Sequence, residues 1–263
     1  MIYLALVEFM KMRELLISLT IVAALIVGIA AGPSAHAESG KPLIVVELYT
    51  SQGCSSCPAA DAFLGELLDM RTDIIGLEFH VDYWDNLGWK DIFSSTESTV
   101  RQRAYARTLG LSYVFTPQMV INGSASEVGS DKMAVMTAIE NARDNSARHL
   151  DITVTQDSDG GLKIALPAAA TGEGDATIWL VNFDRHHRTE VTAGENTGRM
   201  MKNNHVVRGH KAIGTWTGAA LEISIEPDQL AGEGASDGCA ILVQSGKSGP
   251  IIGAASLWLD GAS

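Results

Sequence analysis

The chain has 263 residues and a formal net charge of −12 at pH 7, because 31 acidic residues outnumber 19 basic ones. A chain this acidic, with no basic stripe, is a poor candidate for binding nucleic acid or an anionic membrane surface. Hydrophobic residues make up 46% of the sequence, which is enough to build a buried core. We therefore expect a globular protein and exclude nucleic acid as a partner.

The N-terminal segment, residues 1–37, has the features of an export signal. Lys11 and Arg13 precede the uncharged apolar run LLISLTIVAALIVGIAAG, and Ala35 and Ala37 are the small residues that a signal peptidase recognises. A retained membrane anchor is the alternative, because the apolar run is close in length to a spanning helix. We expect cleavage after Ala37, a periplasmic or secreted location, and no stable membrane span afterwards.

Residues 41–148 alternate between two kinds of pattern. Strand-like apolar runs lie at residues 43–50, 73–84 and 118–123, and helical patterns lie at residues 57–70, 94–111 and 130–145. The first strand, LIVVELYT, is apolar almost throughout, which is typical of a strand buried on both faces of a sheet. This alternation predicts a small α/β domain over residues 41–148.

Residues 149–263 lack a convincing long helical pattern. Short strand-like runs such as LDITVTQ, GLKIALP, ATIWLVNF and CAILVQS are separated by clusters of Gly, Asp, Asn and Ser. This spacing predicts a second domain that is an all-β sandwich or barrel. The stretch GENTGR, residues 194–199, is interpreted as a turn, because it lacks the Gly-Lys-Ser/Thr ending of a phosphate-binding loop. Cys239 precedes the apolar run AILV and is interpreted as a core thiol.

Two of the three cysteines, Cys54 and Cys57, lie between the first predicted strand and the first predicted helix. The free N–H groups and the dipole at a helix N-terminus favour negative charge, so Cys54 should ionise more easily than a free thiol. Cys57, a turn inside, would be shielded and able to resolve a mixed disulfide. An exported chain is open to oxidation, so the pair predicts a redox dithiol that needs no further cofactor.

Two other uses of the cysteine pair remain open. Together with His80, the two thiolates could form a three-coordinate copper(I) site or an open zinc site. The pair could instead form a structural disulfide in a non-catalytic binding module, although so short a loop removes little entropy from the unfolded chain. We prefer the redox interpretation, in which the protein holds no metal.

Aromatic and polar residues follow the second predicted strand, in the segment FHVDYWDNLGWKD. Ligand sites of α/β sheets lie at the carboxyl ends of strands, so His80, Asp82, Trp84 and Trp89 could line a groove beside the cysteines. The two tryptophans would suit an extended peptide. Each residue alone could equally be structural, but the cluster predicts a surface that binds an exported protein or a thiol substrate.

A later segment, YVFTPQMVING, places Thr116 and Pro117 directly before a strand. Together with the cysteine pair, this segment resembles the thioredoxin fold over about residues 43–145. The resemblance implies a cis peptide bond at Pro117, a substrate chain held by Thr116 and Pro117, and a buried acid at Glu47 that handles the proton of Cys57. The Ser-Ser dipeptide between the cysteines departs from the usual thioredoxin motif, so the direction of electron flow is not predicted.

The motifs TSQGCSSCP, FHVDYWDNLGW, TPQMVING, GENTGR and HVVR extend over nearly the whole exported chain. They resemble a family of exported bacterial proteins of unknown function, with a thioredoxin-like half and a β-rich half. The resemblance implies an α/β thioredoxin-like domain followed by an all-β domain over residues 149–263. We predict an exported thiol–disulfide oxidoreductase of this architecture, and the sequence does not predict its oligomeric state.

Overall fold

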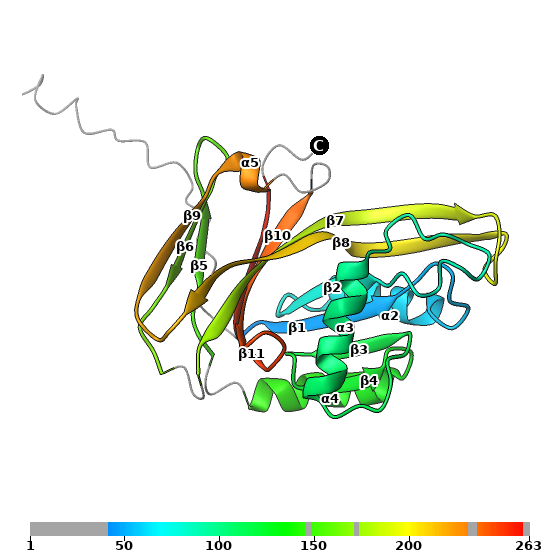
Figure 1. Cartoon of the computed structure of the whole chain (residues 1–263), viewed down its shortest axis with the longest axis horizontal. Coiled ribbons are helices and arrows are strands. Elements are labelled where there is room, and N and C mark those ends of the chain that lie inside the picture. The colour runs from blue at the N-terminus through cyan, green and yellow to red at the C-terminus, as the bar shows by residue number, and fades with distance from the viewer. Residues whose placement is uncertain (1–41, 146–148, 171–173, 231–235, 260–263) are drawn as a thin grey trace, which may run out of the picture. The chain divides into compact units, whose positions relative to one another are not determined.

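The computed structural model of the chain describes residues 42–145, 149–170, 174–230 and 236–259 (Figure 1). The predicted export signal, residues 1–37, lies outside these ranges. All the described residues belong to a single unit. No helix within the described ranges is both long enough and apolar enough to cross a membrane.

Up to residue 144 helices and strands are mixed, and strands dominate after it. The first part contains β1 (Ile44–Thr50), α2 (Pro58–Met70), β2 (Ile74–His80), α3 (Thr96–Thr108), β3 (Gln118–Ile121), β4 (Ala125–Val128) and α4 (Lys132–Asp144). The second part contains β5 (Thr153–Gln156), β6 (Leu162–Leu166), β7 (Ala176–Val191), β8 (Arg199–Trp216), β9 (Leu221–Ile225), α5 (Pro227–Leu230), β10 (Gly238–Ser245) and β11 (Ile251–Trp258). The predicted runs before residue 145 therefore correspond to real elements, with β4 as an added strand.

The strands form one eight-stranded mixed sheet and one three-stranded sheet. The order in the large sheet is β11-β10-β7-β8-β2-β1-β3-β4, and the small sheet has the order β5-β6-β9. β1 and β2 are parallel, whereas β3 runs antiparallel to β1. The early and late strands meet where β8 runs parallel to β2, with Val206 in register with Glu78.

The predicted fold class, an α/β thioredoxin-like domain followed by a separate all-β domain, is wrong. The eight-stranded sheet contains strands from both sides of residue 148, so the described protein is mostly β around one large mixed sheet. The cause is the length of β7 and β8, which have 16 and 18 residues. Part of each strand forms an antiparallel sheet with β10 and β11, and the rest extends as a two-stranded arm beside β2 (Figure 1). The limits 41–148 and 149–263 stay a prediction about the organisation of the chain.

The first strand is buried on both faces, as its apolar sequence predicts. Ile44, Val46 and Leu48 pack in a core cluster with residues of α2 and α4. Val45 and Tyr49, which point to the opposite face, pack in a second cluster with residues of α3 and of the late strands. Helices α2 and α4 therefore cover one face of the sheet around β1, and α3 lies against the other.

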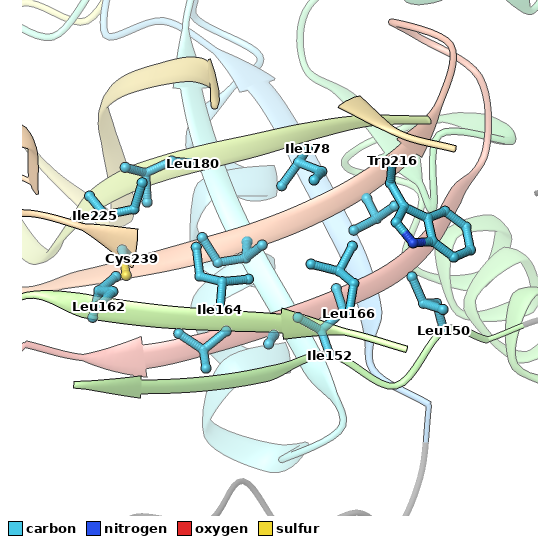
Figure 2. Close-up of a cluster of buried hydrophobic side chains, with 14 of the residues drawn as sticks. Leu150, Ile152, Leu162, Ile164, Leu166, Ile178, Leu180, Trp216, Ile225 and Cys239 are labelled. Carbon is cyan, nitrogen blue, oxygen red and sulfur yellow. The ribbon is translucent and has the colours of Figure 1, made fainter. Parts of the chain in front are cut away.

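A third core cluster lies between the three-stranded sheet and β7, β10 and β11 (Figure 2). Ile164 of β6, Leu180 of β7 and Ile241 of β10 are each about 1% exposed or less. Cys239 is fully buried in this cluster, as predicted, and burial raises the pKa of its thiol to about 12. Cys239 is therefore an unreactive packing residue.

Candidate functional site

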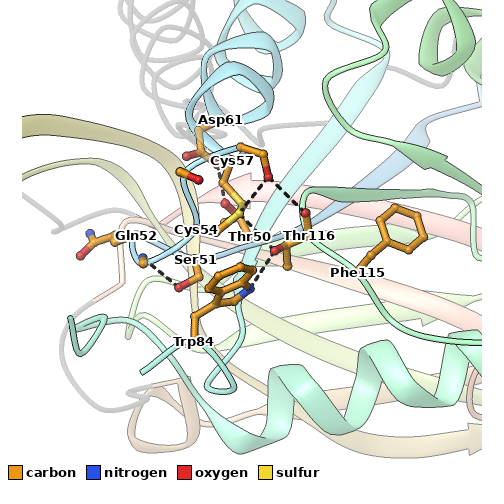
Figure 3. Close-up of a disulfide and its surroundings, with 12 residues drawn as sticks. Thr50, Ser51, Gln52, Cys54, Cys57, Asp61, Trp84, Phe115 and Thr116 are labelled. Carbon is orange, nitrogen blue, oxygen red and sulfur yellow. Dashed lines mark hydrogen bonds between the residues drawn. A yellow bond between two sulfur atoms is a disulfide. The ribbon is translucent and has the colours of Figure 1, made fainter. Parts of the chain in front are cut away.

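Cys54 and Cys57 form a disulfide between the end of β1 and the start of α2 (Figure 3). Cys57 is the N-cap residue of α2, and Pro58 follows it in the first turn, where a missing N–H group costs little. Both cysteines are 0% exposed, whereas Ser55 and Ser56 between them are exposed. The pair lies at the strand-to-helix junction that the sequence predicts, but the two sulfur atoms are shielded from solvent.

Thr116 and Trp84 lie over Cys54 (Figure 3). The Thr116 hydroxyl donates a hydrogen bond to Cys54 Sγ at 3.2 Å, and the indole N–H of Trp84 donates to Thr116 Oγ1 at 2.9 Å. The Ser56 hydroxyl donates to the Thr116 carbonyl at 3.4 Å. The Thr116–Pro117 peptide bond is cis, which confirms that prediction. The structure thus brings Cys54, Trp84, Thr116 and Pro117 together, and their roles in substrate binding stay a prediction.

Trp89 and Asp82 form hydrogen bonds with residues other than Cys54, Trp84 and Thr116. The indole N–H of Trp89 donates to Gln52 Oε1 at 3.2 Å, so Trp89 supports the segment that precedes the cysteines. Asp82 accepts hydrogen bonds from the hydroxyls of Thr99 and Thr96 at 2.6 and 2.7 Å. Partial burial would raise the pKa of Asp82, but these hydrogen bonds outweigh it and lower the pKa. Asp82 thus stabilises the start of α3, and its predicted role in binding substrate is untested.

His80 lies in a buried ion pair. Its Nδ1 is 2.6 Å from Asp91 Oδ2, and its Nε2 is 3.6 Å from Glu78 Oε2. Burial alone would lower the pKa of His80, but the two carboxylates outweigh burial and raise the pKa to about 10. No group of three His, Cys, Asp or Glu side chains in the described part of the chain is arranged to hold a metal ion. The geometry of His80 therefore gives no support to the metal alternative.

A buried group of three acids and one histidine lies at the carboxyl ends of β1 and β2, beside the segment that leads into the disulfide. We call Asp61 of α2, Glu78 and His80 of β2, and Asp91 of the loop before α3 the acid cluster. Asp61 comes four residues after Cys57, on the same face of the helix, and accepts a hydrogen bond from the Thr50 hydroxyl at 2.6 Å (Figure 3). Of the described side-chain atoms, none donates a hydrogen bond to Asp61 Oδ2.

The pKa values of the acids in this cluster are shifted in opposite directions. Burial and then the nearby Glu78 raise the pKa of Asp61 well above its usual value. Burial also raises the pKa of Glu78, even though His80 acts against it. Burial would raise the pKa of Asp91 as well, but the charge and hydrogen bond of His80 outweigh it and lower the pKa. His80 and Asp91 therefore form a charged pair, whereas burial favours the protonated form of Asp61.

Sequence reasoning missed Asp61, Glu78 and Asp91. Two signals were available: Asp61 follows Cys57 at the spacing of one helical turn, and Glu78 interrupts an otherwise apolar strand that is buried along its whole length.

Glu47 lies away from the cysteines. The guanidinium of Arg101 donates to both of its carboxylate oxygens at 2.8 Å, and the hydroxyls of Tyr49 and Tyr105 each donate to it at 2.8 Å. Burial would raise the pKa of Glu47, but Arg101 outweighs burial and lowers it. Alternation along β1 also points Glu47 to the face opposite α2. The catalytic role predicted for Glu47 is untested, and the geometry favours a structural ion pair.

The turn at residues 194–199, between β7 and β8, reaches the segment that precedes the disulfide. Nδ2 of Asn196 donates to the carbonyl oxygens of Gln52 and Cys54, at 2.9 Å in both cases. Asn196 is 0% exposed. The interpretation of GENTGR as a turn is confirmed, but its contact with the cysteine loop had no signal in the sequence, since 142 residues separate Asn196 from Cys54.

A cavity of about 1570 Å³ lies elsewhere in the molecule. Its lining includes Met133 and Asn141 of α4, Trp216 of β8 and Ile252 of β11, together with residues of the β3–β4 connection. None of the predicted site residues lines this cavity, so its volume says nothing about the cysteine pair.

The fold and the site define a class of protein. Its members have a large mixed β-sheet and a buried disulfide at the point where a central strand leads into a helix. The chain belongs to the family described as protein of unknown function DUF1223, whose family model matches residues 45–244. The predicted membership of a family of unknown function is thereby confirmed. The thioredoxin likeness of the N-terminal part is not confirmed by this match.

Two solved structures resemble the chain. A crystal structure of a protein from Agrobacterium tumefaciens is 31% identical, with a TM-score of 0.74, and the match covers 86% of this chain and 98% of that one. HBP35 of Porphyromonas gingivalis is 16% identical, with a TM-score of 0.56, and the match covers 86% of this chain and 77% of that one. The second likeness concerns the fold alone. No curated protein matches the chain.

Proposed function

We propose that the protein is an exported thiol–disulfide oxidoreductase that uses the Cys54–Cys57 pair in a thioredoxin-like site. The observation that supports this most is the hydrogen bond of 3.2 Å from the Thr116 hydroxyl to Cys54 Sγ, next to a disulfide at the start of a helix. A donor at this sulfur and the free N–H groups of the helix both stabilise a thiolate on Cys54. Thr116, Pro117 and Trp84 then form the surface that receives the substrate chain.

The exchange uses two substrate thiols. One substrate thiolate attacks Cys54 Sγ, which forms a mixed disulfide and releases the sulfur of Cys57. A second substrate thiolate attacks the substrate sulfur of the mixed disulfide and releases Cys54. The substrate disulfide leaves, the protein becomes a dithiol, and the two protons of the substrate thiols end on the protein or in solvent. The reverse steps oxidise the protein and reduce the substrate.

The acid cluster can supply the proton that Cys57 takes up during this exchange. A buried thiolate is costly, so the sulfur released from Cys57 must gain a proton as it leaves the disulfide. Asp61 is one helical turn away, and burial raises its pKa, which favours the protonated form that can donate a proton. We therefore assign to Asp61 the proton role that sequence reasoning gave to Glu47.

The setting that we propose for the reaction rests on the export signal predicted at residues 1–37. In the periplasm or outside the cell, disulfides form and persist, so exported proteins or small thiols are the expected substrates. The dithiol itself holds the electrons, and the reaction needs no organic cofactor or metal. A substrate must displace Trp84 or Thr116 to reach Cys54, because the sulfur is fully buried.

A second candidate is a non-catalytic binding protein with a structural disulfide. The observation that favours it is the complete burial of both cysteines, since redox-active pairs usually expose the attacking sulfur. This candidate predicts a disulfide that stays oxidised in strongly reducing buffers and never forms a mixed disulfide.

One experiment separates the two candidates. The mature protein and its Cys57→Ser variant are incubated with glutathione and with a disulfide-containing protein, and free thiols are then alkylated. We expect wild type to cycle between dithiol and disulfide, and Cys57→Ser to accumulate a mixed disulfide through Cys54. The matched control is Cys239→Ser, which should behave as wild type because Cys239 lies in a different core cluster. Absence of any mixed disulfide would establish the structural candidate.

A further inference from the structure

The turn between β7 and β8 is built to approach the cysteine loop closely. Gly194 has a φ of +74°, and a Cβ atom on it would lie 3.1 Å from Trp89 Cβ. Gly88, with a φ of +101°, packs against Gly194, and a Cβ on Gly88 would lie 3.3 Å from Gly194 Cα. Only glycine combines these backbone conformations with so close an approach. The buried Asn196 then fixes the turn on the carbonyl oxygen of Cys54.

Glu195 of this turn places a carboxylate at the start of α2. Its Oε2 accepts a hydrogen bond from the backbone N–H of Ser55 at 3.2 Å. Ser55 lies between the two cysteines, where free N–H groups would otherwise be available to a thiolate on Cys54. A fixed negative charge at this position repels that thiolate and occupies one of its donors.

From these contacts we propose that the β7–β8 turn sets the redox properties of the cysteine pair: Glu195 holds Cys54 in a less acidic state and thereby stabilises the disulfide. The inference rests on the proposed function, because it concerns the attacking sulfur of the exchange reaction. It gives the long arm of β7 and β8 a role at a site that is distant in the sequence. Asn196 acts as a positioning residue, since it holds the turn in place without touching a sulfur atom.

The direction of the effect follows from the thiolate. A more stable Cys54 thiolate stabilises the reduced protein, so removing the charge of Glu195 should shift the equilibrium toward the dithiol. The relevant reaction is protein disulfide plus two glutathione molecules giving protein dithiol plus glutathione disulfide. A charge at an exposed helix N-terminus changes an equilibrium by about two- to fivefold. We expect changes of that size in the acid dissociation constant of Cys54 and in the glutathione equilibrium constant.

The test uses a charge series at one position in the mature protein. Glu195→Gln keeps the hydrogen-bond acceptor and removes the charge, and Glu195→Lys reverses the charge. Glu190→Gln is the matched control, because Glu190 is an exposed acid in β7 outside the turn. The ionisation of Cys54 is followed by alkylation rate against pH in a Cys57→Ser background. The equilibrium constant with glutathione is measured with both cysteines present.

We expect Cys54 to become more acidic in the order wild type, Gln, Lys, with Glu190→Gln equal to wild type. The differences should be large at an ionic strength of ~0.01 M and small at ~1 M, because Glu195 is exposed to solvent and salt screens its charge. Equal values for Glu195→Gln and Glu190→Gln would overturn the inference, as would a salt-independent difference. A Cys54 alkylation rate that follows the series, in a protein whose Cys57→Ser variant forms no mixed disulfide with glutathione or with the protein substrate, would sink the proposed function and leave the effect of Glu195 on the acidity of Cys54 standing.

Discussion

Replacing Asp61 with Asn tests whether the acid cluster stores a proton next to the disulfide. Asn keeps an oxygen that accepts the hydrogen bond of the Thr50 hydroxyl, and it cannot ionise. In the wild-type protein, burial and Glu78 raise the pKa of Asp61 well above its usual value of 3.8. The folded protein therefore binds one more proton at Asp61 than the unfolded chain does, over the whole interval between the two pKa values.

The sign and size of the effect follow from proton linkage. Where the folded state binds the extra proton, the free energy of unfolding falls by about 1.4 kcal/mol for each unit by which the pH rises. The fall begins near the unfolded-state pKa of Asp61 and ends near its raised folded-state pKa. The variant lacks this contribution. Wild type should thus lose about 3 kcal/mol relative to Asp61→Asn over two pH units within the interval.

The assay is urea unfolding of the oxidised protein at several pH values upward from about 4, the ordinary pKa of an aspartate. Asp69→Asn is the matched control, because Asp69 is an exposed acid on the same helix. The difference between the stability curves of wild type and Asp61→Asn should slope with pH, and the difference for Asp69→Asn should be flat. Parallel curves for all three proteins would show that Asp61 ionises as it does in the unfolded chain. That result would refute the hypothesis that Asp61 binds an extra proton in the folded protein.

Three further predictions follow from the same contacts. Asp61→Asn should slow thiol–disulfide exchange through Cys57 by about 100-fold near neutral pH, measured by the release of a trapped mixed disulfide; an unchanged rate would refute the proton role. Arg101→Met should lower the free energy of unfolding by about 3–5 kcal/mol in a denaturant titration, because it leaves the buried carboxylate of Glu47 without its cationic partner. A loss below about 1 kcal/mol would contradict the ion pair. His80→Ala should leave zinc affinity weak in both proteins in a competition titration of the reduced protein against a chelator, and tight binding that collapses in the variant would restore the metal alternative.

The sequence predicted the features that depend on neighbouring residues. The place of Cys54 and Cys57 between a strand and a helix follows from an apolar run, a Pro in the first helical turn and an amphipathic pattern. The turn at residues 194–199 was likewise predicted from a short motif, and each of these signals lies within a few residues of the feature that it predicts. The cis bond at Pro117 was predicted in another way, from the resemblance to thioredoxin that this segment carries together with the cysteine pair.

The sequence did not predict the features that depend on pairing between distant strands. β7 contains the polar stretch Arg185-His186-His187-Arg188, which resembles a strand end, yet the strand continues through it to Val191. The polar residues are tolerated because Arg185, His186 and Arg188 are exposed on the arm. The pairing of Val206 with Glu78 has no local signal at all, and it is this contact that joins the two parts into one sheet. The predicted division into two separate folds failed for that reason.

The charged residues of the candidate site were also mispredicted, because their environments depend on residues that are distant in the sequence. Glu47 was chosen because its position in the first strand resembles that of the buried acid of thioredoxins, but Arg101, 54 residues further along the chain, already neutralises it. Asp61 was overlooked because an acid near the start of a helix is usually a solvated residue that stabilises the helix dipole. Only the packing of β2 against α2 shows that Asp61 is 1% exposed and faces Glu78.

The energetics of Asp61 bear on the choice between a redox pair and a structural disulfide. A disulfide that joins residues three positions apart restricts the unfolded chain by roughly 2 kcal/mol in the loop-entropy treatment. An unpaired buried carboxyl oxygen such as Asp61 Oδ2, which has no partner among the described atoms, costs about 1–3 kcal/mol. The two effects are of the same size and opposite sign, so the disulfide together with its neighbouring acid stabilises the fold little.

An apolar side chain at position 61, like the buried Phe63 and Leu64 of the same helix, would suit a purely structural disulfide better. The acid is useful where a proton must move as the sulfur of Cys57 enters and leaves a disulfide, which is the chemistry of exchange.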